Sequence, residues 1–144
     1  MTLHAPYDTS NIFAKILRGE MPSVRVFEDD VALAFMDVFP MGEGHTLVIP
    51  KRGDARHFID LPEREVGDYM IRVQKVARAV EKGLQPDGVR IFQFNGAPAG
   101  QSVFHLHFHI MPVWEGVKMG AHASGGMKSA AELEPVAARI RAGF

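Results

Sequence analysis

The chain has 144 residues, of which 47% are hydrophobic and 23% charged, as is ordinary for a globular domain with a substantial core. Its 16 basic and 17 acidic residues give a formal net charge of -1, so no overall basic field draws it to nucleic acid. It contains no cysteine, which excludes disulfides, thiolate zinc sites and cysteine nucleophiles. The amino-terminal residues lack the basic and apolar stretches of a signal peptide, and we expect a soluble cytoplasmic protein.

The first half of the chain predicts a short helix followed by three strands. Ser10 or Asn11 can cap the helix, and Gly19 can end it. The first two strands are expected to form a hairpin around an acidic pair. The predicted elements are the helix 11–18, the strands 24–28 and 32–37, the turn 40–44 and the strand 45–50.

The second half predicts a long amphipathic helix, two more strands and a closing helix. Apolar residues recur at three- and four-residue steps between 62 and 84, the spacing of one helix face. Residues 129–142 predict the closing helix, with Ser129 as its cap, Glu132 three residues later and Pro135 near its start. The strands are expected at 89–94 and, after a glycine-containing loop at 95–100, at 101–112.

These elements predict an α+β fold without an internal repeat or a second domain. Most connections between the strands are too short for the crossovers that parallel strands need. Only the stretch 51–88 is long enough to leave the sheet and return with a helix. We therefore expect a five-stranded antiparallel sheet with the long helix on it and a short helix near the amino terminus.

Three of the seven histidines, His105, His107 and His109, alternate with apolar residues and are called the histidine row below. Successive side chains of a strand point to opposite faces, so a strand here would place the three imidazoles on one face. Leu106, Phe108 and Ile110 would then point into a core. The row would span about 13 Å, at roughly 6.6 Å per two residues. Imidazole titrates near neutrality and can act as nucleophile, proton carrier or metal ligand.

Two readings of the row do not involve nucleophilic catalysis. The histidines could occupy the solvent face of a half-exposed strand, although a passive strand would not need a glycine-containing loop beside it. Histidines two residues apart on a strand also ligate zinc. The outer two lie too far apart to share an ion, since a Zn–N bond is ~2 Å, so a further ligand would have to come from His45, His57, His122 or a carboxylate. We expect neither a metal site nor a cofactor.

Nucleophilic catalysis on a phosphoryl group accounts for both the row and the loop. Small residues in the loop let a ligand approach the backbone, and Asn95, Gln101 and Ser102 supply amide and hydroxyl donors. Donors aimed at one point beside imidazoles suit an anion that gains charge in its transition state. The sequence has no Gly-x-x-x-x-Gly-Lys-Ser/Thr pattern, so this loop is not a P-loop.

The row resembles the signature of the histidine-triad (HIT) superfamily, His-φ-His-φ-His-φ-φ with φ apolar, and the matching run is Gln101-Ser-Val-Phe-His-Leu-His-Phe-His-Ile-Met111. Further blocks resemble family segments in the same order, at 12–16, 26–30, 33–37 and 44–51. The resemblance is strongest to the Hint-type and bacterial branch of nucleotide hydrolases. It implies a single HIT domain over 1–144, with its core at about 10–112 and a tail at 113–144 that follows no family pattern.

The resemblance implies a purine-nucleotide-binding enzyme that acts at an α-phosphate. Family members cleave this phosphate from its leaving group in nucleoside phosphoramidates, aminoacyl adenylates or dinucleoside polyphosphates. The middle histidine, His107, would attack phosphorus in line and form a nucleotidyl-histidine intermediate that water hydrolyses. To attack, it must be neutral, and the resemblance implies that a nearby backbone carbonyl holds the proton of its other nitrogen.

The resemblance also implies roles for the side chains around His107. His109 would lie against the phosphate and, with Ser102, help to move a proton to the leaving group. His105 would be structural and supported by His45 from the neighbouring strand. The phosphate oxygens would be held by Asn95 and Gln101.

The nucleoside, an AMP or GMP moiety, would bind in a pocket beside the histidines. Asp37 resembles the family acid that accepts hydrogen bonds from the ribose hydroxyls, although a turn-capping aspartate before Pro40 is an alternative. The base would lie in an apolar slot lined by Ile12, Phe13, Ile16, Phe35, Val38 and Leu47.

The resemblance implies a homodimer whose two sheets join edge to edge, and neither a nucleic acid nor a membrane is expected as a partner. The β-prone strand 89–94 and the apolar stripe of the helix 62–84 favour this assembly. One departure from the family is that many bacterial relatives carry the Cys-x-x-Cys of a structural zinc site where this chain has Asn11-Ile-Phe-Ala14. The alternative function is a nucleotide-binding regulatory protein with little turnover, although an intact His107 argues against a dead enzyme.

Overall fold

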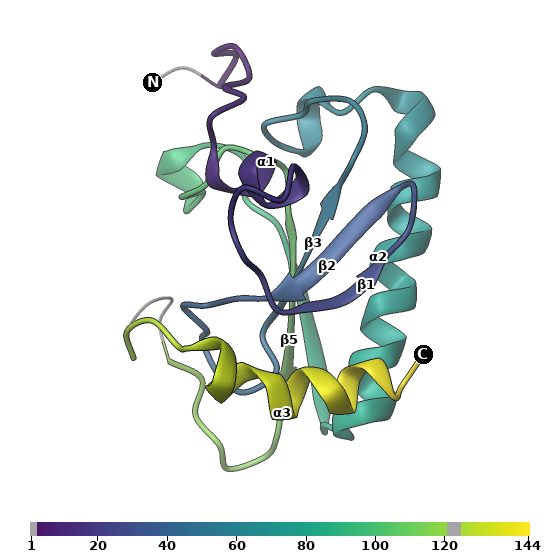
Figure 1. Cartoon of the computed structure of the whole chain (residues 1–144), viewed down its shortest axis with the longest axis vertical. Helices are drawn as coiled ribbons and strands as arrows, with labels where there is room; N and C mark the ends of the chain where they lie inside the picture. The colour runs from purple at the N-terminus through teal and green to yellow at the C-terminus, as the bar shows by residue number, and fades with distance from the viewer. Residues whose placement is uncertain (1–2, 121–124) are drawn as a thin grey trace.

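An antiparallel sheet forms the centre of the molecule (Figure 1). The computed structural model describes residues 3–120 and 125–144, and within them five strands lie in the order β1-β2-β3-β5-β4, with every neighbouring pair antiparallel. Their bounds are β1 Arg25–Glu28, β2 Ala32–Met36, β3 Thr46–Pro50, β4 Gly88–Phe92 and β5 Phe108–Val113. The predicted α+β fold with its five-stranded sheet is confirmed.

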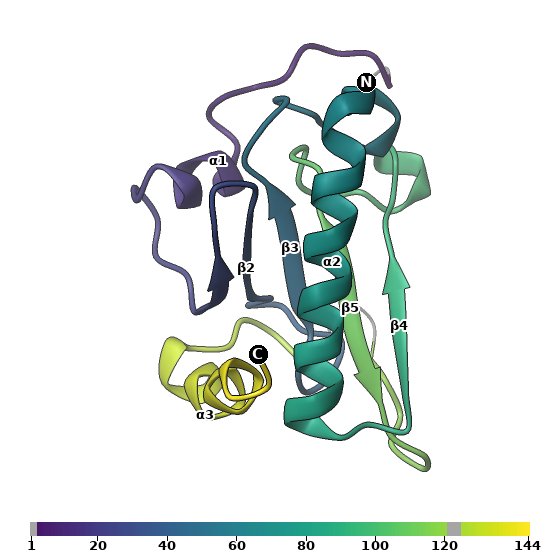
Figure 2. The same ribbon diagram turned by 90° about the vertical axis from the view of Figure 1, so that its right-hand side faces the viewer.

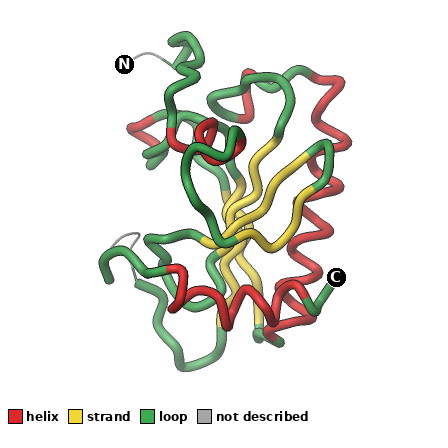
Figure 3. Tube along the Cα trace, in the orientation of Figure 1, coloured by secondary structure: helices red, strands yellow, loops and turns green. Residues whose placement is uncertain are grey.

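Three α-helices surround the sheet in the described part of the chain: α1 Ile12–Leu17, α2 Glu63–Leu84 and α3 Ala130–Arg141. The long helix α2 runs along one face of the sheet, and α3 crosses near its lower end (Figure 2). Figure 3 shows the strands as one twisted band with α2 beside it. No helix in the described residues is long and apolar enough to cross a membrane.

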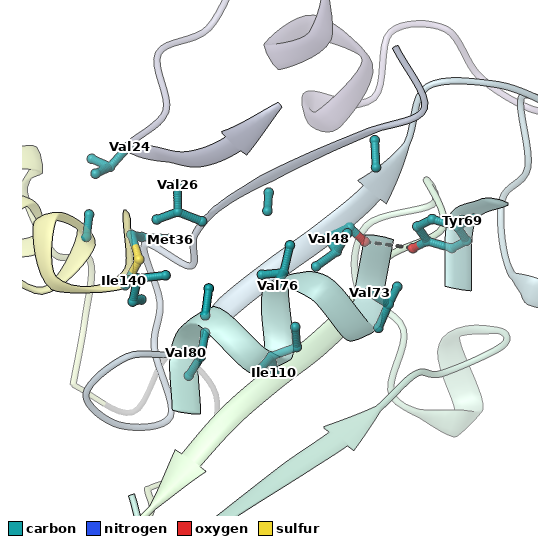
Figure 4. Packing of buried hydrophobic residues seen from close by; sticks show 14 of the residues in the cluster. Val24, Val26, Met36, Val48, Tyr69, Val73, Val76, Val80, Ile110 and Ile140 are labelled. Carbon is teal, nitrogen blue, oxygen red and sulfur yellow. Dashed lines mark hydrogen bonds between the residues drawn. The ribbon is translucent and has the colours of Figure 1, made fainter. Parts of the chain in front are cut away.

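Alternate residues of the sheet face two separate apolar clusters. The larger cluster lies between the sheet and α2, where Val48 and Ile110 meet Val76 and Val80 (Figure 4). The smaller cluster lies on the opposite face and is formed by Phe13, Ile16, Leu33, Phe35, Leu47 and Ile49. Because strand side chains alternate, β3 contributes Val48 to the first cluster and the two residues beside it to the second. The short helix α1 thereby covers the face that carries the histidine row.

The closing helix α3 begins as its sequence predicts. The hydroxyl of Ser129 accepts the amide of Glu132 at 3.2 Å, and the carboxylate of Glu132 accepts the amide of Ser129, which completes a capping box. Pro135 lies inside the helix without ending it. α3 packs closely on α2 at Gly83, where an added Cβ would lie 2.2 Å from the carbonyl oxygen of Arg139.

The histidine row does not lie in one strand, and this prediction is wrong. β5 begins only at Phe108, so His109 is in the strand while the first two histidines belong to the irregular segment before it. This segment leaves the ladder because the amide of Leu106 bonds the carbonyl of Ala55 in a loop, at 2.9 Å. The alternation of faces nevertheless persists, since Leu106 and Ile110 are fully buried in the cluster beneath α2.

Candidate active site

His105 is held by a hydrogen bond at each ring nitrogen. Its Nε2 lies 3.1 Å from the carbonyl oxygen of Pro50, and its Nδ1 lies 2.6 Å from the hydroxyl of Tyr7. A carbonyl can only accept, so Nε2 carries the proton and Nδ1 accepts from the tyrosine. Burial lowers the pKa of His105 from 6.5 to about 4, so this imidazole is neutral at physiological pH.

His107 is oriented by the backbone of the same segment. Its Nδ1 lies 2.7 Å from the carbonyl oxygen of His105, two residues earlier. The proton of a neutral His107 is therefore on Nδ1, and Nε2 presents an unprotonated lone pair. The edge of the Phe13 ring contacts His107 at a centroid distance of 5.0 Å. The arrangement is that of an imidazole prepared to act as a nucleophile.

His109 is the end of a hydrogen-bonded chain that begins at the backbone. The amide of Met41 donates to His45 Nδ1 at 3.0 Å, so the proton of a neutral His45 is on Nε2. That nitrogen lies 2.9 Å from His109 Nδ1 and donates to it. The proton of His109 is thus on Nε2, where it can serve a ligand as a hydrogen-bond donor. The ring of Phe92 stacks on His109, with centroids 4.5 Å apart and an interplanar angle of 8°.

Gly44 allows His45 to reach this position. Its φ of +86° is in the region that favours glycine, and an added Cβ would lie 2.5 Å from Leu84 Cδ1 and 2.8 Å from Pro112 Cγ. The family resemblance implied that His45 would support His105. It instead bonds His109, and the support of His105 comes from Tyr7.

Asp37, His45 and His109 have the composition of a metal site, and their ligand atoms all lie within 4.8 Å of one another. A metal on His45 Nε2 would require the proton to move to Nδ1, where it would face the amide proton of Met41. The donor set therefore fits a hydrogen-bonded chain better than an ion. The Asp37 carboxylate, 3.5 Å from His45 Nε2, adds a favourable charge to that chain.

The other ligands considered for a metal lie elsewhere. His57 Nε2 donates to the carbonyl of Leu3 at 2.8 Å, behind the glycine-containing loop. His122 falls outside the described residues. At the positions where relatives carry the cysteines of a structural zinc site, the side chain of Asn11 accepts the amide of Ala14 at 2.9 Å and caps α1.

The polar residues of the loop are engaged within the chain. Gln101 is buried; its side-chain oxygen accepts the amide of Gly96 at 2.8 Å, and its nitrogen donates to the carbonyls of Arg56 and Val103. Asn95 accepts the amide of Phe58 at 2.9 Å. Ser102 is exposed at the end of the loop. Gln101 thus holds the loop closed on itself, which fixes the backbone beside the histidine row.

The residues predicted to bind the nucleoside are divided between the two faces of the sheet. Phe13, Ile16, Phe35 and Leu47 pack together in the smaller cluster, beside the histidine row. Ile12 is 44% exposed, whereas Val38 packs against the larger cluster on the other face. Asp37 shows the capping interaction, because its Oδ1 accepts the amide of Phe39 at 2.8 Å.

Two cavities lie near these residues, and neither is lined by His107. One of about 220 Å³ lies behind the loop, between Leu3, Arg56, His57 and Phe104. The other, of about 440 Å³, lies between α3 and the turn before β3, with His45 in its wall.

Sequence reasoning missed Tyr7 and Phe92 as neighbours of the histidine row. Phe92 could have been found, because β4 is predicted beside the row and alternate residues of that strand share a face. Nothing in the sequence around Tyr7 signals its role, since residues 3–11 precede the first helix and have no periodic pattern.

The site thus consists of buried imidazoles on one face of an open antiparallel sheet, with tautomers that neighbouring groups fix. The model of the HIT domain family matches residues 18–116, and the chain belongs to this family. HIT proteins form a superfamily of nucleotide-binding hydrolases.

Two solved structures and one sequence relative illustrate the similarity. A Hit-like protein involved in cell-cycle regulation from Bartonella henselae is 46% identical, with a TM-score of 0.88 over 96% of this chain and 100% of that one. A hypothetical histidine triad nucleotide-binding protein from Sulfolobus tokodaii is 30% identical, with a TM-score of 0.81 over 91% and 89%. The adenylylsulfatase HINT3 of Arabidopsis thaliana is 34% identical over 131 residues, which are 85% of this chain and 64% of the plant protein.

Proposed function

We propose that the protein is a nucleotide hydrolase that cleaves an α-phosphate from its leaving group through a nucleotidyl intermediate on His107. The observation that carries the proposal is the 2.7 Å hydrogen bond between His107 Nδ1 and the carbonyl of His105. In the neutral imidazole this bond places the proton on Nδ1 and leaves the Nε2 lone pair directed away from the backbone, as a nucleophilic imidazole requires.

The reaction has two steps on the same nitrogen. In the first, His107 Nε2 forms a bond to the α-phosphorus, while the bond from phosphorus to the leaving group breaks and the leaving group takes up a proton. In the second, water attacks phosphorus and releases a proton to the solvent, the N–P bond breaks, and a nucleoside monophosphate and neutral His107 result. Two easier displacements replace one difficult displacement by water.

In this reaction His109 stabilises the charge on the phosphate, and Ser102 transfers a proton to the leaving group. The Nε2–H of His109 donates to a phosphate oxygen that gains charge in the transition state. Because His45 donates to its Nδ1, a neutral His109 carries its proton on Nε2 and works as a hydrogen-bond donor. The exposed hydroxyl of Ser102 passes a proton from water to the leaving group. The side-chain nitrogen of Asn95 completes the phosphate site. Gln101 acts only by holding the loop, because its side-chain nitrogen already donates to the carbonyls of Arg56 and Val103.

The substrate carries a purine mononucleotide, with AMP or GMP as the transferred part. The smaller apolar cluster lies beside His107 through Phe13. Ile12, the neighbour of Phe13 in α1, is 44% exposed and offers the base an apolar surface. Asp37 is the acid that would accept the ribose hydroxyls. The leaving group is an amine, an acyl group or a second nucleotide, and the name of the plant relative adds sulfate to these classes.

Two further parts of the proposal are a homodimer, formed through the free edge at β4, and a cytoplasmic location. β4 is the last strand of the sheet, and Ile91 on it is 50% exposed. An unpaired strand edge with an exposed apolar side chain favours association with a second copy.

The test is turnover of a substrate panel with a metal chelator present throughout. The panel contains adenylated and guanylated phosphoramidates, an aminoacyl adenylate, a dinucleoside polyphosphate and adenylyl sulfate. We expect the wild type to release a nucleoside monophosphate from at least one of them, and His107→Asn to bind nucleotide but lose turnover by several orders of magnitude.

Three results would count against this proposal. Near-normal turnover by His107→Asn would remove His107 from the mechanism. Nucleotide binding by the wild type without turnover of any member of the panel would favour the alternative, a nucleotide-binding regulatory protein. Activity that is lost with chelator and restored by zinc would favour a metal mechanism.

A further inference from the structure

The segment of residues 3–11, called the amino-terminal arm, lies across the end of the sheet that carries the histidine row (Figures 1 and 2). The carbonyl of Leu3 accepts His57 Nε2 at 2.8 Å, and the carbonyl of Thr9 accepts the guanidinium of Arg18, the C-cap residue of α1, at 2.8 Å. The arm is thus fastened at both ends, to the loop before α2 and to the cap of α1. Tyr7 lies between these two attachments and is half-buried.

Tyr7 is the arm's contact with the histidine row. Its hydroxyl lies 2.6 Å from His105 Nδ1, and its ring meets the imidazole edge-on at a centroid distance of 5.7 Å. Burial raises the pKa of the Tyr7 hydroxyl, so it remains a protonated donor at neutral pH. The family model begins at residue 18 and does not include the arm.

We propose that Tyr7 is a positioning residue for the nucleophile, acting through His105, an inference that rests on the proposed function. His105 has three attachments: Nδ1 to Tyr7, Nε2 to the carbonyl of Pro50, and its own carbonyl to His107 Nδ1. The first two fix the side chain and its tautomer. Through the third, the position of the His105 backbone determines the position of the His107 ring, which attacks phosphorus.

The burial of His105 makes the tyrosine hydroxyl consequential. With the residue only 3% exposed, water does not readily replace a lost donor at Nδ1. Without that donor, the buried Nδ1 lacks a hydrogen bond, so rotation of the imidazole or a change of tautomer becomes more favourable. Either change disturbs the bond to Pro50. The backbone carbonyl that holds His107 then loses its defined position, and a nucleophile held less well attacks more slowly.

The experiment compares Tyr7→Phe with Ser10→Ala in the full chain. Tyr7→Phe keeps the ring and removes only the hydroxyl, whereas Ser10→Ala removes a hydroxyl from the same arm that bonds Asp8 and no histidine. With the panel substrate that the wild type turns over, we expect Tyr7→Phe to lower kcat about threefold to tenfold, as the loss of one hydrogen bond would, and to leave KM unchanged. Ser10→Ala should match the wild type in both constants.

Imidazole nitrogen resonances provide a readout that does not depend on activity. In the wild type, His105 should show the Nε2–H tautomer with a hydrogen-bonded Nδ1, and Tyr7→Phe should shift the Nδ1 resonance while Ser10→Ala does not. An active wild type whose kcat and His105 resonances are both unaltered in Tyr7→Phe would overturn this inference alone. An increase in KM without a change in kcat would also overturn it, in favour of a role in binding. A wild type that turns over no substrate would overturn the proposed function, and with it the catalytic part of this inference.

Discussion

Backbone groups decide where the proton lies on His45, His105 and His107 of the candidate site, and His45 in turn decides it for His109. The carbonyls of Pro50 and His105 accept from His105 and His107, and the amide of Met41 donates to His45. A peptide group does not change its protonation state near neutral pH. The preference that it creates for one tautomer of the neighbouring imidazole is therefore permanent. The sequence predicted the residues of the row and, through the family resemblance, an acceptor for His107. It could not predict the chain that ends at His109, because this depends on which nitrogen faces which partner.

The first prediction concerns the partner of His109. His45→Phe removes the donor to His109 Nδ1, while His45→Gln can keep an N–H group near the same place. We expect His45→Phe to lower kcat about tenfold, the effect of losing one buried hydrogen bond, and His45→Gln to lower it less. Steady-state kinetics on the folded variants measure this order. Wild-type kcat in His45→Phe would show that His109 does not need a fixed tautomer.

The second prediction concerns stability at mildly acid pH. His105 has a pKa of about 4 in the folded protein against 6.5 as its ordinary value, so between these values the unfolded chain binds a proton that the folded chain does not. This contribution is fully present above pH 6.5 and is lost as the pH falls toward 4. From His105 alone, the free energy of unfolding should fall by about 2 kcal/mol between pH 7 and pH 5.

Urea unfolding at the two pH values, with His105→Gln as the control, measures this contribution. The variant should lose less stability than the wild type on acidification, by about the same amount. Equal losses in the two proteins would mean that His105 is not buried in a neutral form.

At the scale of elements, the periodic segments were the predictable ones. The apolar spacing of α2 and the capping pair of α3 define both helices to within a residue or two. The strand that became β5 was predicted too long, because residues 101–107 have the composition of a strand. In the structure the backbone of this segment bonds the loop at Ala55 and the side chain of His107 instead of a neighbouring strand. The arm contacts the site although its sequence shows no element. Tertiary contacts, which have no local pattern, decided both cases.

The packing of α3 on α2 gives the third prediction. Gly83→Ala would place a Cβ 2.2 Å from the carbonyl oxygen of Arg139, so the two helices must separate, at a cost of about 1–3 kcal/mol. Gly67→Ala, in the same helix, meets nothing within 4 Å and should gain about 0.5–1 kcal/mol from helix propensity. Urea unfolding of both variants should give changes of opposite sign. A stabilised Gly83→Ala would mean that α3 does not pack where the structure places it.

At the scale of the whole molecule, the two edges of the sheet differ in how far other parts of the chain cover them. The edge at β1 is covered by α3, whose Arg141 donates to the carbonyl of Arg25 at 2.8 Å. The edge at β4 carries the exposed side chains of Arg90 and Ile91. An open edge on one side favours pairing with a second copy on that side. The sequence favoured the strand 89–94 for this pairing, and the strand order places that strand at the open edge.

The fourth prediction is therefore a dimer that depends on β4. Sedimentation equilibrium at micromolar concentration should give twice the chain mass of 15.9 kDa. Ile91→Lys should shift the equilibrium toward the monomer, because it places a charge in the expected apolar contact. Ile59→Lys, at a residue that is 62% exposed in the turn before α2, is the control and should leave the dimer intact. A wild type with the mass of one chain would show that the edge is not used.

The central claim is a covalent bond between His107 and the α-phosphorus, and rapid quenching tests it most directly. Wild-type protein mixed with a substrate of the panel and quenched in the first turnover should gain the mass of one nucleotidyl group. Peptide mapping should place that group on His107, and His107→Asn should carry none. Turnover by the wild type with no adduct at any quench time, or with the adduct on another residue, would contradict the account.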